Sequence, residues 1–127
     1  MSINRVTAAP GVPPVFPFNL AGAADRTCFI SGMPSLDADG AFAPGTFEEE
    51  TERAWRNVVS IAGAAGYSVE EIVYVQCALA DIGDYSALNH WWRGQFPDVP
   101  TAPARFTFQA AALPFGAKIE LQAVAGR

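Results

Sequence analysis

The sequence predicts one α+β domain spanning residues 1–127, with a mixed sheet of about six strands and two helices on one face of that sheet. Three observations lead to this prediction. The length of 127 residues is typical of one domain, and half of the residues are hydrophobic while 17% are charged. Two segments repeat apolar residues at helical spacing. Several shorter runs alternate apolar and polar residues, as strands with one buried face do.

The first 24 residues predict a short strand, at 3–7, followed by extended chain. Arg5 and the apolar residues after it superficially resemble a secretion signal, but four prolines exclude a helical core for such a signal. The longest weakly polar run, 58–69, is too short to span a bilayer. We therefore expect a soluble cytoplasmic protein with no membrane partner.

Residues 18–31 predict a hairpin, in which 19–23 turn at 24–26 into 27–31. The first helix is expected to begin at Thr46, because T-F-E-E matches a capping box in which Thr46 and Glu49 exchange side-chain hydrogen bonds with each other's backbone amides. The acidic run 48–50 suits the positive end of the helix dipole, so it indicates a helix start and not a metal site. Gly66 is a natural terminator of this helix.

A strand at 73–80 and a second helix from about Asp84 to Phe96 follow. The strand is apolar on both sides, with Val75 and Cys77 facing one way and Tyr74 and Ala78 the other. Both faces of the sheet should therefore be buried, yet two helices can cover only one. The simplest partner for the second face is another copy of the chain, so the sequence predicts an oligomer.

Residues 103–124 read as two strands joined by a short connection that contains Pro114 and Gly116. Apolar residues alternate with polar ones in both halves, and Arg105 and Glu120 fall on the polar sides. If the two strands pair as a hairpin with their apolar sides together, Arg105 and Glu120 share the opposite face. An arginine on an arbitrary strand is more often an ordinary solvated side chain, which is the alternative interpretation.

Three motifs favour a functional role for Arg105 over that of a solvated side chain. They are P-A-R-F-T at 103–107, L-P-F-G-A-K-I-E at 113–120, and Ile30-Ser31-Gly32. Together they resemble the Rid (YjgF) family of imine and enamine deaminases, in the family's order over residues 15–124. The resemblance implies a single Rid-like domain that forms a homotrimer, a trimeric chorismate-mutase-like assembly with active sites in the clefts between subunits. It implies no cofactor and no metal.

The resemblance also implies the reaction, which is hydrolysis of a 2-imino acid to a 2-oxo acid and ammonia. Such a small-molecule substrate carries a carboxylate, which the planar fork of Arg105 can bind with two charge-assisted hydrogen bonds. Adding water to the imine requires a group that relays protons, and Glu120 matches the family's glutamate at that position. Arg105 and Glu120 are thus the expected catalytic residues.

Five further residues are expected to bind the substrate by the same resemblance. The backbone of Gly32 and Thr107 would orient the imine and the water, with Ser31 and Asn89 as supporting polar groups. Ordinary turn and helix-surface hydrogen bonding is the alternative role of Ser31 and Asn89. Phe18 stands where active members of the family have tyrosine, and Thr107 where cysteine is common. A larger or more apolar imine, such as one of the aromatic-catabolite 2-aminomuconate type, is therefore the expected substrate.

Other function classes fit less well. The net charge of −5 and the absence of a Lys/Arg cluster argue against a nucleic-acid partner, and with a single histidine they make ribonuclease the least attractive activity. Cys28 and Cys77 lie in strand-like runs and are expected to be buried free thiols, too distant in sequence from His90 to indicate zinc. The main alternative is a non-catalytic trimer that uses Arg105 to bind a carboxylate metabolite, or that binds a partner protein.

Overall fold

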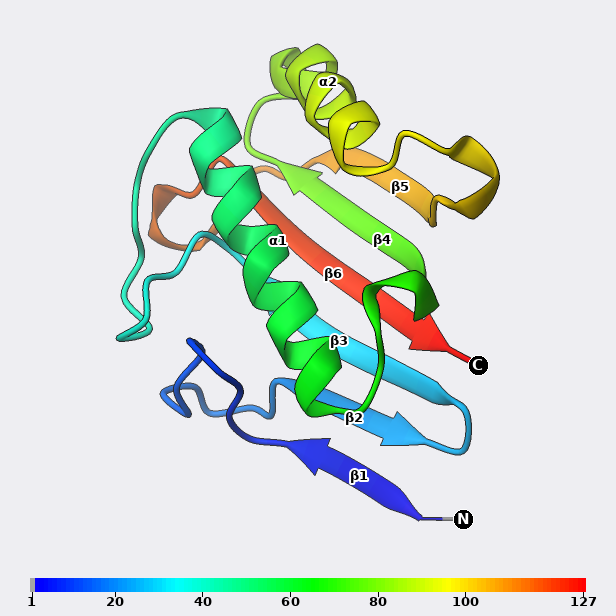
Figure 1. Ribbon diagram of the computed structural model, residues 1–127. Helices are drawn as coiled ribbons and strands as arrows, with labels where there is room; N and C mark the ends of the chain where they lie inside the picture. Colours follow the sequence, from blue (N-terminus) through cyan, green and yellow to red (C-terminus); the bar gives the residue numbers. More distant parts are fainter. Residues whose placement is uncertain (1) are drawn as a thin grey trace.

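A six-stranded mixed sheet lies behind two helices in the computed structural model, which describes residues 2–127 (Figure 1). Met1, the first residue of the predicted domain, lies outside the described residues. The strands and helices are β1 (Ile3–Val6), β2 (Ala21–Ala24), β3 (Thr27–Met33), α1 (Phe47–Ala64), β4 (Ile72–Leu79), α2 (Tyr85–Gln95), β5 (Ala104–Gln109) and β6 (Ile119–Gly126). Short 3-10 turns lie between them: η1 (Val69–Glu71), η2 (Ile82–Asp84), η3 (Val99–Thr101) and η4 (Pro114–Gly116). The predicted fold class is confirmed.

The strand order is β1-β2-β3-β6-β4-β5, and it corrects one prediction. The last two strands do not form a hairpin, because β4 lies between them, antiparallel to β6 and parallel to β5. Alternation of apolar residues tells which face of a strand is buried, but it does not tell which strands are neighbours. Strands two places apart are separated by only about 10 Å, which the connection at 110–118 easily spans.

The first helix begins as its sequence predicts. The Thr46 hydroxyl accepts a hydrogen bond from the amide of Glu49, and the Glu49 carboxylate accepts one from the amide of Thr46 at 2.8 Å. The helix packs on β6 and β3 through one apolar stripe. The residues buried along this helix are Glu50, Thr51, Ala54, Trp55, Asn57, Val58, Ile61 and Ala62.

Both helices cover the same face of the sheet, and they also contact each other (Figure 1). On the covered face Val75, Cys77 and Leu79 of β4 are fully buried. Cys28 and Cys77 are free and buried, as predicted. No helix within residues 2–127 is long and apolar enough to cross a bilayer.

The opposite face of the sheet is uncovered in the single chain and is strongly apolar. Ile3, Phe29 and Phe106 lie on it and are 56%, 60% and 55% exposed. Phe108 stacks against Phe106, with the two ring centroids 5.3 Å apart. We call this uncovered face of the sheet the open face; its exposed aromatic groups are unusual for a monomer in water.

Candidate active site

Arg105 lies beside α2, on the helix-covered side of the sheet. Its Nη2 donates a hydrogen bond of 2.6 Å to Oδ1 of Asn89. The guanidinium also faces two aromatic rings of α2, with its central carbon 5.5 Å from the centroid of Tyr85 and 5.0 Å from that of Trp92. Two rings and one amide therefore fix the plane of the guanidinium, which prepares it for a planar carboxylate. We call these four residues the arginine site.

Two small side chains lie on the sheet beneath the arginine site. Thr107 follows Arg105 by two residues on β5 and pairs with Cys77 of β4. Burial raises the pKa of the Cys77 thiol to about 12, although the nearby Arg105 acts in the opposite direction, so this thiol is an inert packing group. The Thr107 hydroxyl is buried beside the Cys77 thiol, whose pKa it lowers, and it makes no hydrogen bond of standard geometry within residues 2–127. Buried hydroxyls rarely stay unpaired, so Thr107 is a candidate contact for a ligand or a second chain.

Glu120 lines a separate small pocket of about 180 Å³. Apart from this carboxylate the pocket is apolar, and burial raises the pKa of Glu120 above its ordinary value of 4.5. A carboxyl with a raised pKa is a better proton acceptor and holds its proton to a higher pH than an exposed one. We call this the glutamate pocket; its lining residues are Phe16, Phe18, Gly32, Met33, Pro34, Pro114, Phe115 and Glu120.

Gly32 and Ser31 shape this pocket from the irregular end of β3. A Cβ atom on Gly32 would lie 2.8 Å from Oε1 of Glu120, so a larger residue there would displace the carboxylate. The Ser31 hydroxyl donates a 2.7 Å hydrogen bond to the carbonyl of Asn19, which holds the segment that contains Phe18. Ser31 thus makes the backbone hydrogen bond of the alternative interpretation. Asn89, in contrast, accepts a hydrogen bond from Arg105, as a supporting polar group of the site would.

The structure corrects the prediction that Arg105 and Glu120 share one face. Val75 of β4 pairs with Arg105 and lies under the helices, whereas Ala78 pairs with Glu120 and lies on the open face. Paired residues of neighbouring strands point to the same side of a sheet, so the two side chains point to opposite sides. Within one chain the sheet separates the arginine site from the glutamate pocket.

Glu50, a buried residue that was not expected in the site, holds the chain segment that leads to Glu120. Glu50 of α1 is fully buried, and its Oε1 accepts a 2.9 Å hydrogen bond from the amide of Lys118, two residues before Glu120. Its Oε2 accepts from the Lys118 ammonium at 3.2 Å and from the amide of Gly45 at 3.3 Å. Glu50 therefore ties α1 to the chain segment that places Pro114, Phe115 and Glu120.

We expect Glu50→Ala to lower the free energy of unfolding by about 2 to 3 kcal/mol, because it leaves buried backbone amides without an acceptor. Urea denaturation measures the change. The matched control is Glu48→Ala on the same helix turn, whose exposed carboxylate should contribute less than about 1 kcal/mol through the helix dipole. Equal effects of the two substitutions would contradict the anchoring role of Glu50.

Neither the aromatic partners of Arg105 nor most of the wall of the glutamate pocket was predicted from the sequence. Tyr85, Asn89 and Trp92 recur at i, i+4 and i+7, which places them on one side of a helix, and this spacing could have revealed the arginine site. Phe16 and Phe115 gave no such signal, since they come from irregular segments.

A guanidinium fixed by two rings and an amide suits a ligand carboxylate, and a half-buried carboxyl in an apolar pocket suits proton transfer, so the two sites fit a small-molecule enzyme. A protein-family profile described as Endoribonuclease L-PSP matches residues 8–126. The chain therefore belongs to this family, which is also called YjgF/Rid.

Curated relatives are similar in sequence to this protein over nearly its whole chain. A Capra hircus protein named 2-iminobutanoate/2-iminopropanoate deaminase is 36% identical over 97% of this chain and 90% of its own. The Homo sapiens protein of the same name is 37% identical, with the same coverage of both chains. Such relatives place this protein among deaminase enzymes, and they give no support to the non-catalytic alternative.

Solved structures confirm the fold. The YjgF gene product of E. coli superposes with a TM-score of 0.84 and 26% identity, covering 98% of this chain and 99% of its own. E. coli TdcF with bound serine superposes with a TM-score of 0.83 and 27% identity, covering 100% and 99% of the two chains.

Proposed function

We propose that this protein hydrolyses the C=N bond of 2-imino acids with an apolar side chain, releasing a 2-oxo acid and ammonia. The observation that carries the proposal is the pair of complementary sites: a guanidinium fixed by Asn89, Tyr85 and Trp92, and a carboxyl with a raised pKa in an apolar pocket. The names of the deaminase relatives support the reaction class.

Arg105 holds the substrate carboxylate in this proposal. A guanidinium forms two parallel hydrogen bonds to a carboxylate, and the flanking rings and Asn89 hold it ready for this geometry. TdcF binds serine, a small molecule with the same carboxylate group, on the same fold. Thr107, on the same strand, offers its backbone and its unpaired hydroxyl to the imine.

Glu120 moves the protons. Water adds to the imine carbon as one of its protons passes to the nitrogen, which gives a carbinolamine. The hydroxyl proton of the carbinolamine then passes to the amine nitrogen, and the C–N bond breaks as the C=O bond forms, which releases ammonia and the 2-oxo acid. The carboxylate of Glu120 accepts the proton of the attacking water and returns it to the nitrogen, which its raised pKa favours. Gly32 permits this placement, because its missing side chain leaves room for the carboxylate.

The two sites act together only if they come from different chains. The sheet separates Arg105 from Glu120 in one chain, and the open face exposes aromatic residues that a partner would bury. A homotrimer satisfies both requirements, with the glutamate pocket of one subunit placed against the arginine site of the next. Cyclic association of identical chains also gives three equivalent sites.

We expect sedimentation equilibrium to give a particle three times the 13.5 kDa chain mass. Phe106→Asp on the open face should weaken the association roughly tenfold or more, because the aromatic ring is replaced by a charge at the contact. The matched control is Val99→Asp in η3, a residue that is 79% exposed and away from the open face. A monomeric wild type, or a Phe106→Asp protein that associates like the wild type, would contradict the proposed trimer.

The apolar wall of the glutamate pocket sets the substrate class. Phe16 and Phe18 stack with ring centroids 5.2 Å apart, and Phe115 stacks on Phe42 at 5.8 Å. Phe18 supplies no hydroxyl, so a polar or very small substrate loses a hydrogen bond there and gains little from the rings. Branched or aromatic side chains fit this wall better. A substrate of the 2-aminomuconate type is larger, but it carries a second carboxylate that the apolar wall does not complement.

The test is a screen of imines generated by an amino-acid oxidase, followed by ammonia release. Wild type is expected to prefer the imines of leucine and phenylalanine to that of alanine. Phe18→Tyr should raise the rate with the alanine imine roughly tenfold, because one hydrogen bond to a polar group contributes about 1 to 3 kcal/mol. Equal rates on all three imines in both proteins would contradict the apolar substrate class, and no turnover of any imine would contradict the deaminase proposal.

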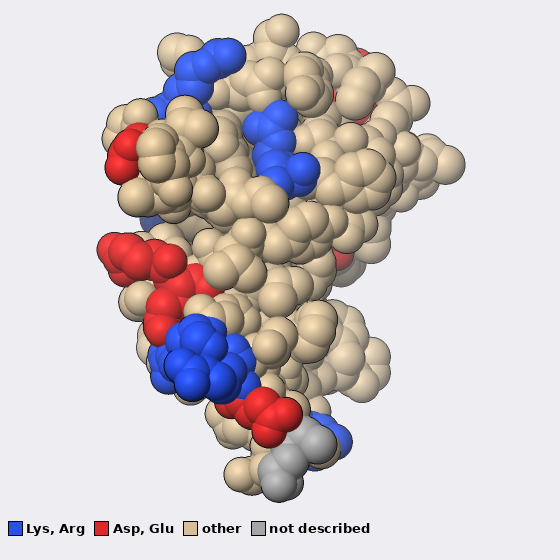
Figure 2. All heavy atoms as spheres, turned by 90° about the vertical axis from the view of Figure 1, so that its right-hand side faces the viewer, with Lys and Arg blue, Asp and Glu red and all other residues tan. Residues whose placement is uncertain are grey.

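The absence of a nucleic-acid partner and the cytoplasmic location stay predictions. The net charge of −5 supports the first, and the Lys and Arg side chains on the side shown in Figure 2 lie in separate groups. For the second, one relative, the mmf2 protein of Schizosaccharomyces pombe, is named mitochondrial.

A further inference from the structure

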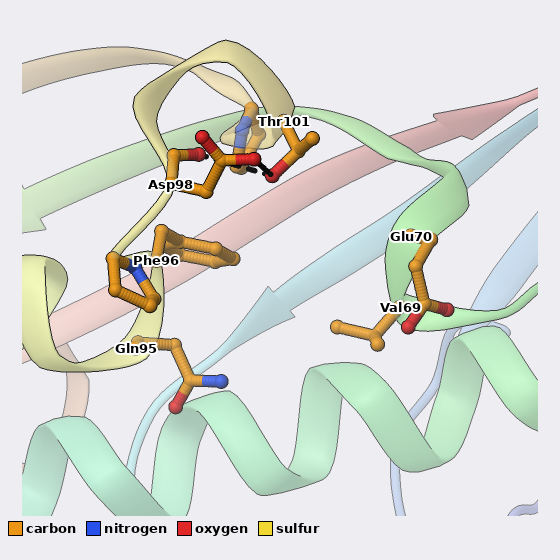
Figure 3. Close-up of a pocket in the computed structure, with 8 residues that line it drawn as sticks. Val69, Glu70, Gln95, Phe96, Asp98 and Thr101 are labelled. Carbon is orange, nitrogen blue, oxygen red and sulfur yellow. Dashed lines mark hydrogen bonds between the residues drawn. The ribbon is translucent and has the colours of Figure 1, made fainter.

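A second and larger pocket, of about 530 Å³, shares no lining residue with the glutamate pocket or the arginine site, although it borders the latter (Figure 3). Its two walls come from segments distant in sequence: the end of α2 with η3 on one side, and η1 on the other. This volume is within the range of small-molecule sites. The lining residues are Val69, Glu70, Gln95, Phe96, Pro97, Asp98, Thr101 and Pro103.

The pocket combines apolar surfaces with two carboxylates. Val69 and Phe96 face the space from opposite walls, with Glu70 on the side of η1 and Asp98 on the side of η3 (Figure 3). No lysine or arginine lines it. The nearby Arg127 pairs with Glu71 at 2.7 Å and not with Glu70, for which no hydrogen bond or ion pair is found within residues 2–127.

Asp98 is held in place but keeps bonding capacity for a ligand. The Thr101 hydroxyl donates to the Asp98 carbonyl at 3.0 Å and lies 3.3 Å from one carboxylate oxygen, Oδ2. The other carboxylate oxygen of Asp98, Oδ1, has no hydrogen-bond partner within residues 2–127. Two carboxylates with free acceptors above apolar side chains complement a cation with an apolar body.

We propose that this pocket binds an organic cation, in which an ammonium group is joined to an aromatic or branched apolar body. An anion would meet two carboxylates and no cation, so its binding is unfavourable. A neutral apolar molecule would shield Glu70 and Asp98 from water without pairing them. No cluster of three metal-ligating His, Cys, Asp or Glu side chains occurs in residues 2–127, so a bare metal ion is not the fitting cation.

The aromatic contacts of Phe96 make binding observable. Its ring centroid lies 4.5 Å from that of Trp92 and 5.5 Å from that of Trp55. A ligand that contacts Phe96 should therefore change tryptophan fluorescence. Trp92 also faces Arg105, which makes Phe96 and Trp92 a direct physical link between this pocket and the arginine site.

The test titrates the full-length protein with 4-phenylbutylamine, and with 4-phenylbutanol as a neutral probe of nearly the same shape. The amine should bind roughly 5- to 10-fold more tightly, and Glu70→Gln with Asp98→Asn should remove that difference. Amide NMR shifts should concentrate in residues 69–71 and 95–103. The matched control is Glu48→Gln with Asp39→Asn, two exposed carboxylates outside this pocket, which should leave binding unchanged.

Three results would overturn the proposal: equal affinity for amine and alcohol, unchanged amine affinity in the Glu70 and Asp98 double variant, or NMR shifts centred elsewhere. The readouts are binding measurements and need no turnover. Their outcome therefore does not depend on whether the protein has the proposed deaminase activity.

Discussion

Arg105→Lys should lose most of the deaminase activity while the protein stays folded. Lysine keeps the positive charge, but it cannot form two parallel hydrogen bonds to a carboxylate, nor can it present a flat group between the rings of Tyr85 and Trp92. Losing one charge-assisted hydrogen bond in the transition state costs about 1.5 to 3 kcal/mol, so kcat/KM should fall roughly 10- to 100-fold.

Steady-state kinetics and a thermal melting curve check this expectation together. Arg93→Lys is the matched control, because Arg93 is an exposed arginine of the same helix that contains Asn89 and Trp92. The control should keep wild-type kcat/KM and Tm. An Arg105→Lys enzyme with unchanged kcat/KM would refute carboxylate binding by Arg105, and a large drop in Tm would mean that the residue serves the fold instead.

Mixing two inactive variants should restore activity if each site combines two chains. Arg105→Ala lacks the arginine site and Glu120→Gln lacks the proton relay, so neither homotrimer has a complete site. In trimers reassembled from equal amounts of both, each site takes Arg105 from one chain and Glu120 from the next. Random assembly then leaves about one-quarter of the sites intact.

The control for this experiment mixes the two proteins without unfolding and reassembly, which should give little recovery if subunits exchange slowly. No recovery in properly reassembled mixed trimers would contradict a shared site.

The pH profile gives an independent measure of Glu120. If the carboxylate accepts the proton of water, activity rises as pH increases through the pKa of Glu120. Because burial raises that pKa, the rise should lie above pH 4.5. Glu120→Gln cannot titrate and should show no such rise in its residual activity. A wild-type profile that is flat from pH 4 to 7 would argue against this role.

Most individual elements could be predicted because their signals are local. The capping box at Thr46, the helical stripe from Ala54 to Ala62, and the alternation in β4 each depend on residues close together in sequence. Each of these elements is present in the structure. The apolar character of both sides of β4 also indicated a second apolar face, which the exposed Phe29 and Phe106 now display.

The predicted final hairpin failed because strand neighbours are chosen by packing over the whole domain. Because β4 lies between β5 and β6, the apolar sides of these two strands are on different faces of the sheet. The apolar side of β5 is on the open face, where Phe106 is exposed, and the apolar side of β6 lies under the helices. Arg105 and Glu120 then point to opposite sides. The wall of the glutamate pocket was missed for a related reason, since Phe16 and Phe115 come from segments without a regular period.

The sequence by itself determined the family, the α+β class and the identities of the chemically able residues, because helix caps, residue periods and the P-A-R and K-I-E motifs are properties of neighbouring residues. Only the tertiary structure decided that Arg105 is held by Asn89 and two rings of α2, and that Glu120 lies on the other side of the sheet. The physical reason is that a strand's own alternation defines two sides, whereas the strands that pair with it determine which of those sides meets the helices.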